Sequence, residues 1–423
     1  MYFGREAMSA IDEVRSGRAT PPRPAALARG SEVYEDAYRT GPLRAFRHPT
    51  RREPARNRAQ SGRPLRIALI APLYESVPPR LYGGTERIVA YLADALVDLG
   101  HDVTLFASVE ARTRAHLVPV RDQAIRLDPS PLKSDLAAHL AMLHDVRQHA
   151  LEFDILHFHV DLIHFPFFES LAHHTVTTLH GRLDLKDLPE VYRCWPQYPL
   201  ISVSDRQRLA LPEANWVATV HHGTPVELYR FCAQPEGGYV AFLGRIAPEK
   251  RLDRAIEIAR RAGLPLKIAA KVDVADAAYY HERIAPLLRR PGVEFLGEIS
   301  DDEKSAFLGL ASALLFPIDW PEPFGLVMIE AMACGTPVIA WNCGSVPELV
   351  ADGITGFIVD SEEAAAAALR RIDVIDRRRV RSVFEERFSA TAMAGEYVAV
   401  YWHQLGLSAP VDALDETAAA AAQ

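Results

Sequence analysis

The chain has 423 residues, of which 49% are hydrophobic and 24% are charged, and its formal net charge is −8. This length is enough for two or three domains with cores of their own, and the composition is ordinary for a soluble globular protein. The net negative charge argues against general nucleic-acid binding. No apolar run approaches the roughly 20 residues of a membrane span, and the N-terminus lacks the apolar core of a secretory signal, so we expect a cytoplasmic protein.

The cysteines and histidines predict no metal centre. His157 and His159 would share one face of a strand, but no acidic or cysteine partner stands at a recognised metal-ligand spacing. The cysteines are scattered, without a C-x-x-C pair, and we expect reduced thiols at Cys194, Cys232, Cys334 and Cys343.

Residues 1–63 differ from the rest of the chain. They are rich in Arg, Pro and Ala, contain no Lys, and show little apolar periodicity. This composition predicts a disordered extension, with a short helix over 31–39 and a second possible start at Met8. A basic arm for an anionic partner is the alternative interpretation.

The first folded region, 64–232, alternates apolar strand patterns with amphipathic helix patterns. Gly83-Gly84 follows the first strand, and Thr85 is expected to be the N-cap of the next helix. Such alternation is typical of a doubly wound parallel sheet. The expected strands cover 66–71, 103–106, 155–159, 175–179, 200–203 and 216–220, and the expected helices 85–99 and 134–150.

A second α/β pattern starts after a linker at 233–238 and continues to 388. Its expected strands cover 239–243, 266–270, 293–296, 313–316, 336–340 and 356–359, with helices ending near 262 and over 277–288, 301–310, 326–333 and 362–371. A last helix over 389–405, within a segment 389–408, has an apolar stripe that predicts packing, and 409–423 is an Ala-rich tail that we expect to be flexible. The fold class is therefore α/β, with two Rossmann-like sheets whose carboxyl edges face a ligand cleft.

Two carboxylates stand beside a predicted helix start in 317–341. Pro321 and Pro323 hold Glu322 on a stiff loop, and Phe324-Gly325 opens a helix that also carries Glu330. Helix N-termini offer free amides to anions, and ionised carboxylates accept hydrogen bonds from vicinal diols. The stretch predicts a site for a nucleotide sugar.

The turn after the first strand of the second region carries cations. Gly244-Arg245 and Lys250-Arg251 could neutralise a diphosphate, Arg as a fork and Lys as a point charge. A solvated charged turn is the alternative. Gly83-Gly84 would let the backbone approach a ligand, although turns use Gly-Gly freely. His180 follows a strand end and is either a ligand contact or a structural histidine.

Taken together, these motifs make the sequence resemble the retaining glycosyltransferases of family 4, which have the GT-B fold. The motifs that carry the resemblance extend over about 65–405. They are 82–86 (YGGTE), 178–181 (TLHG), Gly244-Arg245 with Glu249-Lys250-Arg251, and Glu322 with Glu330 as the E-x7-E signature. The phrase 319–325 (DWPEPFG) is similar to a bacterial subgroup of the avilamycin-pathway type.

The resemblance implies a role for each motif. Arg245 and Lys250 would hold the donor diphosphate, and Glu330 would bind the ribose. Glu322, with the amides of Phe324, Gly325 and Leu326, would bind the sugar hydroxyls. Gly83 and Gly84 would lie against the phosphates, His180 would contact the transferring sugar, and Gly297-Glu298 would border the base. Two departures from the family are His222-Gly223 for the usual Asn-Gly, and 270–273 (AKVD) for a glycine-rich turn.

The resemblance further implies transfer of a hexose from a nucleotide diphosphate sugar to a hydroxyl acceptor, without metal or cofactor. The acceptor would be a glycan, a small molecule or a lipid-linked species, and peripheral membrane contact is possible but not indicated. Retention by a front-face route is expected, because no carboxylate is placed as a nucleophile. The alternatives are another GT-B enzyme, namely an epimerase or a phosphorylase, and a non-catalytic sugar-nucleotide sensor.

Overall fold

The structure is a computed structural model that describes residues 63–80 and 83–407. The predictions for residues 1–62, including the helix over 31–39 and the start at Met8, lie outside the described residues. So does the predicted tail at 409–423.

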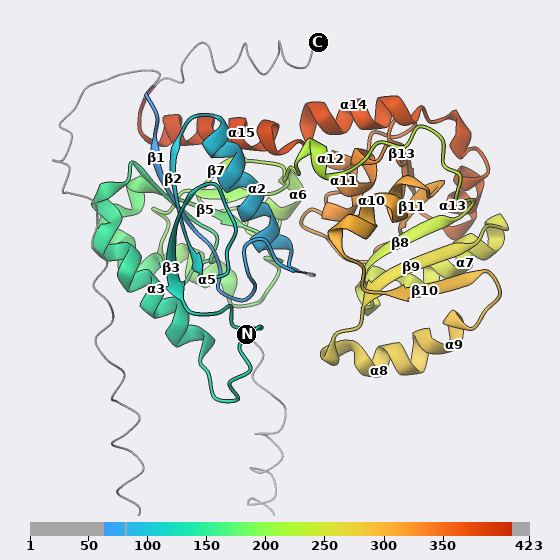
Figure 1. Ribbon diagram of the computed structural model, residues 1–423, viewed down its shortest axis with the longest axis horizontal. Coiled ribbons are helices and arrows are strands. Elements are labelled where there is room, and N and C mark those ends of the chain that lie inside the picture. The colour runs from blue at the N-terminus through green and yellow to red at the C-terminus, as the bar shows by residue number, and fades with distance from the viewer. Residues whose placement is uncertain (1–62, 81–82, 408–423) are drawn as a thin grey trace, which may run out of the picture. The chain divides into compact units, whose positions relative to one another are not determined.

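A sheet of seven parallel strands forms the first half of the described chain, in the order β3-β2-β1-β4-β5-β6-β7 (Figure 1). The strand order reverses between the adjacent strands β1 and β4, and this arrangement is a doubly wound sheet. Its strands are β1 (Arg66–Ile70), β2 (Asp102–Ser108), β3 (His116–Arg121), β4 (Ile155–Phe158), β5 (Thr175–Leu179), β6 (Leu200–Ser202) and β7 (Trp216–Thr219).

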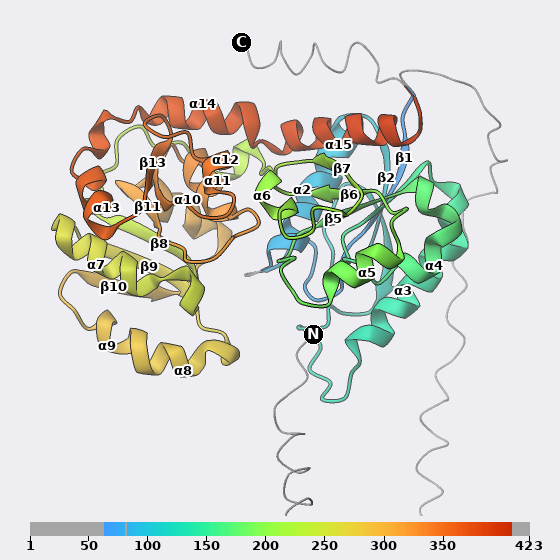
Figure 2. The ribbon, with the colours of Figure 1, turned by 180° about the vertical axis from the view of Figure 1, so that it is seen from behind.

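Alternating side chains of the first sheet enter two separate cores. Ile67 and Leu69 of β1 lie in one core with α2 (Gly84–Asp98) and α15 (Ala390–Gln404). Ala68 and Ile70 lie in the other core with helices that Figure 2 labels. These are α3 (Asp135–His149), α4 (Phe165–Phe168) and α5 (Leu188–Cys194). Because successive strand residues point to opposite faces, an uninterrupted apolar strand needs a helix layer on both sides.

The second sheet has six parallel strands in the order β10-β9-β8-β11-β12-β13. Its strands are β8 (Val240–Arg245), β9 (Leu266–Lys271), β10 (Val293–Gly297), β11 (Ala313–Phe316), β12 (Val338–Trp341) and β13 (Gly356–Val359). Its helices are α7 (Leu252–Ala262), α8 (Ala277–Tyr279) and α9 (Ala285–Leu288), α10 (Asp301–Gly309), α11 (Leu326–Ala333), α12 (Val346–Leu349), α13 (Glu362–Leu369) and α14 (Arg377–Arg387). The order reverses between β8 and β11, and the predicted fold class is confirmed.

Three local predictions need correction. Thr85 is not an N-cap, because α2 begins at Gly84 and Gly83 occupies the cap position without a side-chain hydrogen bond. Strand β3 was not predicted; it contains Pro119, which is tolerated because β3 is an edge strand. Helix α14 was also missed, because its arginine-rich sequence hides a buried face of Val380, Val383 and Phe384.

Helix α15 packs against α2 and the first sheet. Tyr397, Tyr401 and Trp402 are buried there, and α15 follows α14 of the second half directly (Figure 1). In the described part of the chain, no helix has the length and apolarity that crossing a bilayer requires.

Candidate functional site

The loops after β8 and β11 hold the predicted sugar and phosphate contacts. These two strands are neighbours and flank the point where the strand order reverses, which is where ligands bind in open α/β sheets. The Asp319 amide donates a hydrogen bond of 2.9 Å to the Glu249 carbonyl, so the two loops are joined. Residues 72 positions apart in sequence, Lys250 and Glu322, therefore meet.

Lys250 and Glu322 form an ion pair between Nζ and Oε2. The indole Nε1 of Trp320 donates a hydrogen bond of 2.8 Å to the same carboxylate oxygen, and Lys250 Nζ lies 5.3 Å from the Trp320 ring centroid. The Lys250 and Glu322 side chains are 17% and 14% exposed. The cation and the acid are thus held together in a position where part of each remains open to a ligand.

Residues 323–325 form a tightly held turn into α11. The hydroxyls of Ser204 and Ser345 donate to the carbonyls of Pro323 and Phe324 at 2.6 and 2.5 Å. Gly325 has φ 89°, and a Cβ there would lie 2.9 Å from Phe316 Cζ, so glycine is required. The first amides of α11 have no partner within their own helix and carry its positive end.

The N-terminus of α2 meets the N-terminus of α11. A Cβ added at Gly84 would lie 3.6 Å from Leu326 Cδ1, so the Gly84 backbone lies against Leu326. A Cβ on Gly83 would lie 2.8 Å from Pro79 Cβ, and this close contact explains a glycine at that position. The structure thus brings the two predicted amide-bearing turns together.

Arg245 is surrounded by acidic side chains. It ends β8, donates a hydrogen bond of 2.6 Å to Glu249, and lies 3.6 Å from Asp273 and 3.3 Å from Asp276. Lys271 pairs with Asp273 at 2.9 Å, so the turn that departs from the family is part of this cluster. The contact of Arg245 with a diphosphate stays a prediction.

Glu330 is 2% exposed and is bound by side chains that the sequence analysis did not identify. It accepts hydrogen bonds from the Tyr229 hydroxyl at 2.8 Å and from Lys304 Nζ at 3.2 Å. Lys304 also lies 3.1 Å from Asp301, which forms an ion pair with Arg87 of α2. Burial opposes the charge on Arg87, but Tyr91, Asp301 and Glu330 outweigh it and raise the pKa of Arg87.

Of the contact residues that the sequence analysis missed, one could have been recognised from its position in the sequence. Trp320 stands two residues before Glu322, where an indole N–H can reach the carboxylate. Tyr229 and Lys304 had none, because they are 101 and 26 residues from Glu330.

Gly297 and Glu298 follow the edge strand β10. Gly297 has φ 77° and marks a register shift between β10 and β9. Glu298 is exposed, and the chain continues into α10. Lys304 of α10 forms ion pairs with Asp301 and with Glu330. A contact of Gly297-Glu298 with a base stays a prediction.

His180 follows β5 and belongs to a group of neighbouring imidazole rings. Its Nε2 lies 2.9 Å from Nδ1 of His159, and its ring centroid lies 5.1 Å from that of His222. The His222 ring in turn contacts Phe324 at 4.7 Å. Burial lowers the pKa of His180 to about 3, so the ring is neutral at physiological pH and can exchange hydrogen bonds but does not supply a positive charge.

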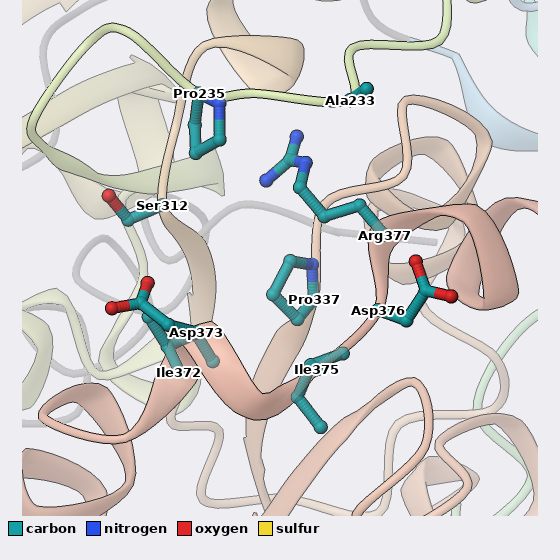
Figure 3. A pocket seen from close by; sticks show the side chains of 9 residues that line it. All are labelled: Ala233, Pro235, Ser312, Pro337, Ile372, Asp373, Ile375, Asp376 and Arg377. Atoms are coloured by element: carbon teal, nitrogen blue, oxygen red, sulfur yellow. The ribbon is translucent and has the colours of Figure 1, made fainter.

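A cavity of about 320 Å³ lies at the other end of the second sheet (Figure 3). Ser312 and Pro337, which line it, precede β11 and β12 and so mark the amino ends of these strands. Arg377 also lines it, but this guanidinium donates to the carbonyls of Cys232, Gly309 and Ala311. The chemistry-bearing residues stand at the carboxyl ends, and we place the site there.

Family models match both halves of the chain. The model for "Glycosyltransferase Family 4" matches residues 82–224, and the model for "Glycosyl transferases group 1" matches residues 233–388. The chain is a family 4 glycosyltransferase. The second match contains Arg245, Lys250, Glu322 and Glu330, and the first contains Gly83, Gly84 and His180.

The relatives of this glycosyltransferase act in several pathways. A phosphatidyl-myo-inositol mannosyltransferase of Mycolicibacterium smegmatis is 27% identical, over 77% of this chain and 88% of that protein. A glycogen synthase of Mycobacterium tuberculosis is also 27% identical, over 79% of this chain and 95% of that one. The similarity supports glycosyl transfer but leaves the substrate open.

Solved structures share the GT-B fold with this glycosyltransferase. AviGT4, a glycosyltransferase involved in avilamycin A biosynthesis, has a TM-score of 0.63 and 22% identity, over 81% of this chain and 98% of that one. Anabaena HepE in complex with UDP and glucose has a TM-score of 0.61 and 18% identity, over 79% of this chain and 99% of that one.

The buried histidines predict that this glycosyltransferase loses stability below about pH 6.5. Burial holds the pKa of His157, His159 and His222 well below the usual value, as it does for His180. The unfolded chain therefore binds more protons between the two pKa values, and stability falls as pH falls through this window. Each histidine contributes up to about 1.4 kcal/mol per pH unit.

Urea unfolding at about pH 7 and pH 5.5 measures this effect. We expect His222→Asn, which places the family's usual residue before Gly223, to reduce the pH dependence by about one proton. An unfolding free energy of the wild type that does not change between these two pH values would contradict the prediction.

Proposed function

We propose that this glycosyltransferase moves a hexose from a nucleoside diphosphate sugar to a hydroxyl acceptor, with retention of configuration. The observation that carries the proposal is the Lys250–Glu322 pair beside the N-termini of α2 and α11. A cation and helix amides suit the diphosphate, and a carboxylate suits the sugar hydroxyls.

Each residue has a part in this reaction. Lys250 stabilises the charge that develops on the leaving phosphate, and Arg245 joins it after releasing a carboxylate. Glu330 accepts hydrogen bonds from the ribose, which replace those from Tyr229 or Lys304. Stabilisation of developing charge by fixed cations and amides supplies most of the acceleration.

Retention follows from a front-face route in this proposal. The leaving phosphate takes the proton of the acceptor hydroxyl while the new bond forms on the same face of the sugar. No carboxylate nucleophile is then required, and Lys250, Arg245 and the helix amides provide the countercharge without a metal.

A soluble acceptor is favoured over a membrane lipid. Helices α2 and α3 of the first half contain one arginine each and no lysine, so neither offers a strongly basic face to anionic lipids. The relatives include enzymes named for both kinds of product, a phosphatidyl-myo-inositol mannoside and a glucan.

The donor is tested by thermal shift against UDP, GDP and ADP and their hexose conjugates. A ligand at 100 times its Kd stabilises the folded state by about 2.7 kcal/mol, so the nucleotide with the matching base gives the largest increase in Tm. We expect the conjugate to stabilise the wild type more than the nucleotide alone, and Glu322→Gln to remove this difference.

The anomeric configuration of the product, read by NMR in the presence of EDTA, tests retention and metal independence.

Two outcomes would contradict the proposal. One is a visible absorbance of bound pyridoxal phosphate, which indicates a phosphorylase. The other is binding of a nucleotide sugar without either transfer or slow hydrolysis, which indicates a sensor.

A further inference from the structure

Trp320 contacts both members of the Lys250–Glu322 pair but has no part in the proposed function. Its indole Nε1 lies 2.8 Å from Oε2 of Glu322, and its ring centroid lies 5.3 Å from Nζ of Lys250. The guanidinium of Arg182, which follows β5 in the first half, lies 5.4 Å from the same centroid. An indole that contacts the sugar-side acid and a cation from each half needs an explanation.

The backbone of Glu322 is fixed on both of its sides. Its amide donates a hydrogen bond of 2.8 Å to the Trp320 carbonyl, which closes a three-residue turn around Pro321, whose ring fixes φ. Its carbonyl accepts a hydrogen bond of 3.1 Å from the Ser345 amide, and Gly344 packs against the Glu322 backbone. The remaining conformational freedom of Glu322 is therefore in its side chain.

The Glu322 side chain is held through one of its two oxygens. Trp320 Nε1 and Lys250 Nζ both contact Oε2. Oε1 has no hydrogen-bond partner among the described residues and is not enclosed. A glutamate side chain samples many rotamers when nothing holds it. Two donors on one oxygen select among these rotamers and leave the other oxygen to accept from a ligand hydroxyl.

The two donors on Oε2 differ in what they contribute. The Lys250 ammonium is a point charge on a flexible stem, and the proposed function turns it toward the leaving phosphate. The Trp320 indole N–H is a donor only, and it belongs to a rigid ring whose backbone is part of the same turn as Glu322. The indole therefore continues to hold the carboxylate while Lys250 contacts the phosphate.

On the basis of the proposed function, we infer that Trp320 is a positioning residue that holds Glu322 with Oε1 toward the hydroxyls of the donor sugar. Its N–H fixes Oε2, and its ring is held in turn by the cations of Lys250 and Arg182. Trp320 thus contributes to binding of the sugar part of the donor and not to binding of the nucleotide part.

Two variants separate the indole N–H from the indole ring. Trp320→Phe keeps an aromatic ring for the two cations but has no donor. Trp320→His lacks the six-membered ring, but its Nε2 can occupy the position of the indole Nε1 and donate. Trp216→Phe is the matched control, because Trp216 also has a cation near its ring, Arg208 at 5.7 Å. Its indole donates a hydrogen bond of 2.8 Å to the Leu211 carbonyl, at the amino end of β7.

Binding of the preferred nucleotide and of its hexose conjugate measures the role of Trp320. We expect Trp320→Phe to weaken binding of the conjugate by about 10- to 100-fold and to leave binding of the nucleotide within about threefold. Trp320→His and Trp216→Phe should stay within about threefold of the wild type for both ligands. In the Glu322→Gln background, Trp320→Phe should have no further effect, because Trp320 acts through Glu322.

Three results would overturn the inference: equal losses for conjugate and nucleotide, equal losses in Trp320→Phe and Trp320→His, or additive losses in the double variant. These measurements need no turnover. A wild type that binds the conjugate no better than the nucleotide would overturn the proposed sugar contact of Glu322 and the inference with it. A wild type with this preference whose Trp320→Phe variant keeps it would overturn the inference alone.

A spectrum of the ligand-free protein tests the hydrogen bond even if a Trp320 variant fails to fold. In protein labelled with ¹⁵N-tryptophan, the chain gives five indole N–H signals. We expect the Trp320 signal to move upfield in Glu322→Ala, because a hydrogen bond to a carboxylate shifts an N–H proton downfield. The other four signals should keep their positions. Five unchanged signals would show that the indole does not hold Glu322 and would overturn the inference.

Discussion

Replacing Lys250 with alanine is expected to lower kcat by about 100- to 1,000-fold. The ammonium is paired with Glu322, lies over Trp320, and belongs to the loop that follows the carboxyl end of β8. A positively charged group fixed at this point costs no reorganisation when negative charge develops on the leaving phosphate. Its loss therefore affects turnover more than donor binding.

Lys267→Ala is the matched control for this variant. Lys267 is also paired with a glutamate, Glu294 at 3.2 Å, and lies 4.8 Å from the ring centroid of Tyr239, but it stands near the amino end of β9. We expect Lys267→Ala to retain wild-type turnover. We expect the unfolding free energy of Lys267→Ala to change by about 1 kcal/mol at most, because its ion pair is more exposed. Lys250→Ala should lose more, up to about 3 kcal/mol, because Glu322 is largely buried and keeps only the Trp320 hydrogen bond. Near-normal kcat in Lys250→Ala would refute the assignment of the leaving-group cation.

Gly344→Ala is expected to reduce kcat/KM by about 100-fold although Gly344 carries no functional group. A Cβ at this position would lie 2.4 Å from the Glu322 amide nitrogen and 2.6 Å from the Glu322 carbonyl oxygen. Backbone atoms cannot move away as the end of a flexible side chain can, so the loop that carries Glu322 must shift. The variant displaces the sugar-side acid and its partner Lys250 without changing either residue.

Gly353→Ala separates this displacement from backbone strain. Gly353 has φ 75°, comparable to φ 55° at Gly344, but a Cβ there would meet nothing within 4 Å. Both variants should lose about 1–3 kcal/mol of stability from the positive φ, as measured by urea unfolding. We expect only Gly344→Ala to lose activity beyond this effect. Equal activities in the two folded variants would contradict the close packing of Gly344 on the Glu322 loop.

The predicted strands and helices agreed well with the structure where the local pattern was strong. β5, β11 and β13 have the predicted bounds, and Gly335 follows α11 with φ 77° as expected of a glycine after a helix end. The misses include β3 and α14, where a proline and a run of arginines masked the apolar face, and the short helices α4, α5, α6 (Asp205–Arg208) and α12. Local periodicity reports burial only when polar residues do not dominate the same segment.

For the candidate site, the sequence identified the residues, and the tertiary structure identified their contact partners. The sequence by itself determined the family, the two sheets, and the residues that carry charge at the strand ends, because these depend on residue types within short segments. Only the tertiary structure decided the partners: Lys250 with Glu322, Arg245 with three carboxylates, and Glu330 with Tyr229 and Lys304. The reason is the strand order. β8 and β11 are separated by about 70 residues in the chain but are neighbours in the sheet, and no local pattern encodes which strand ends meet.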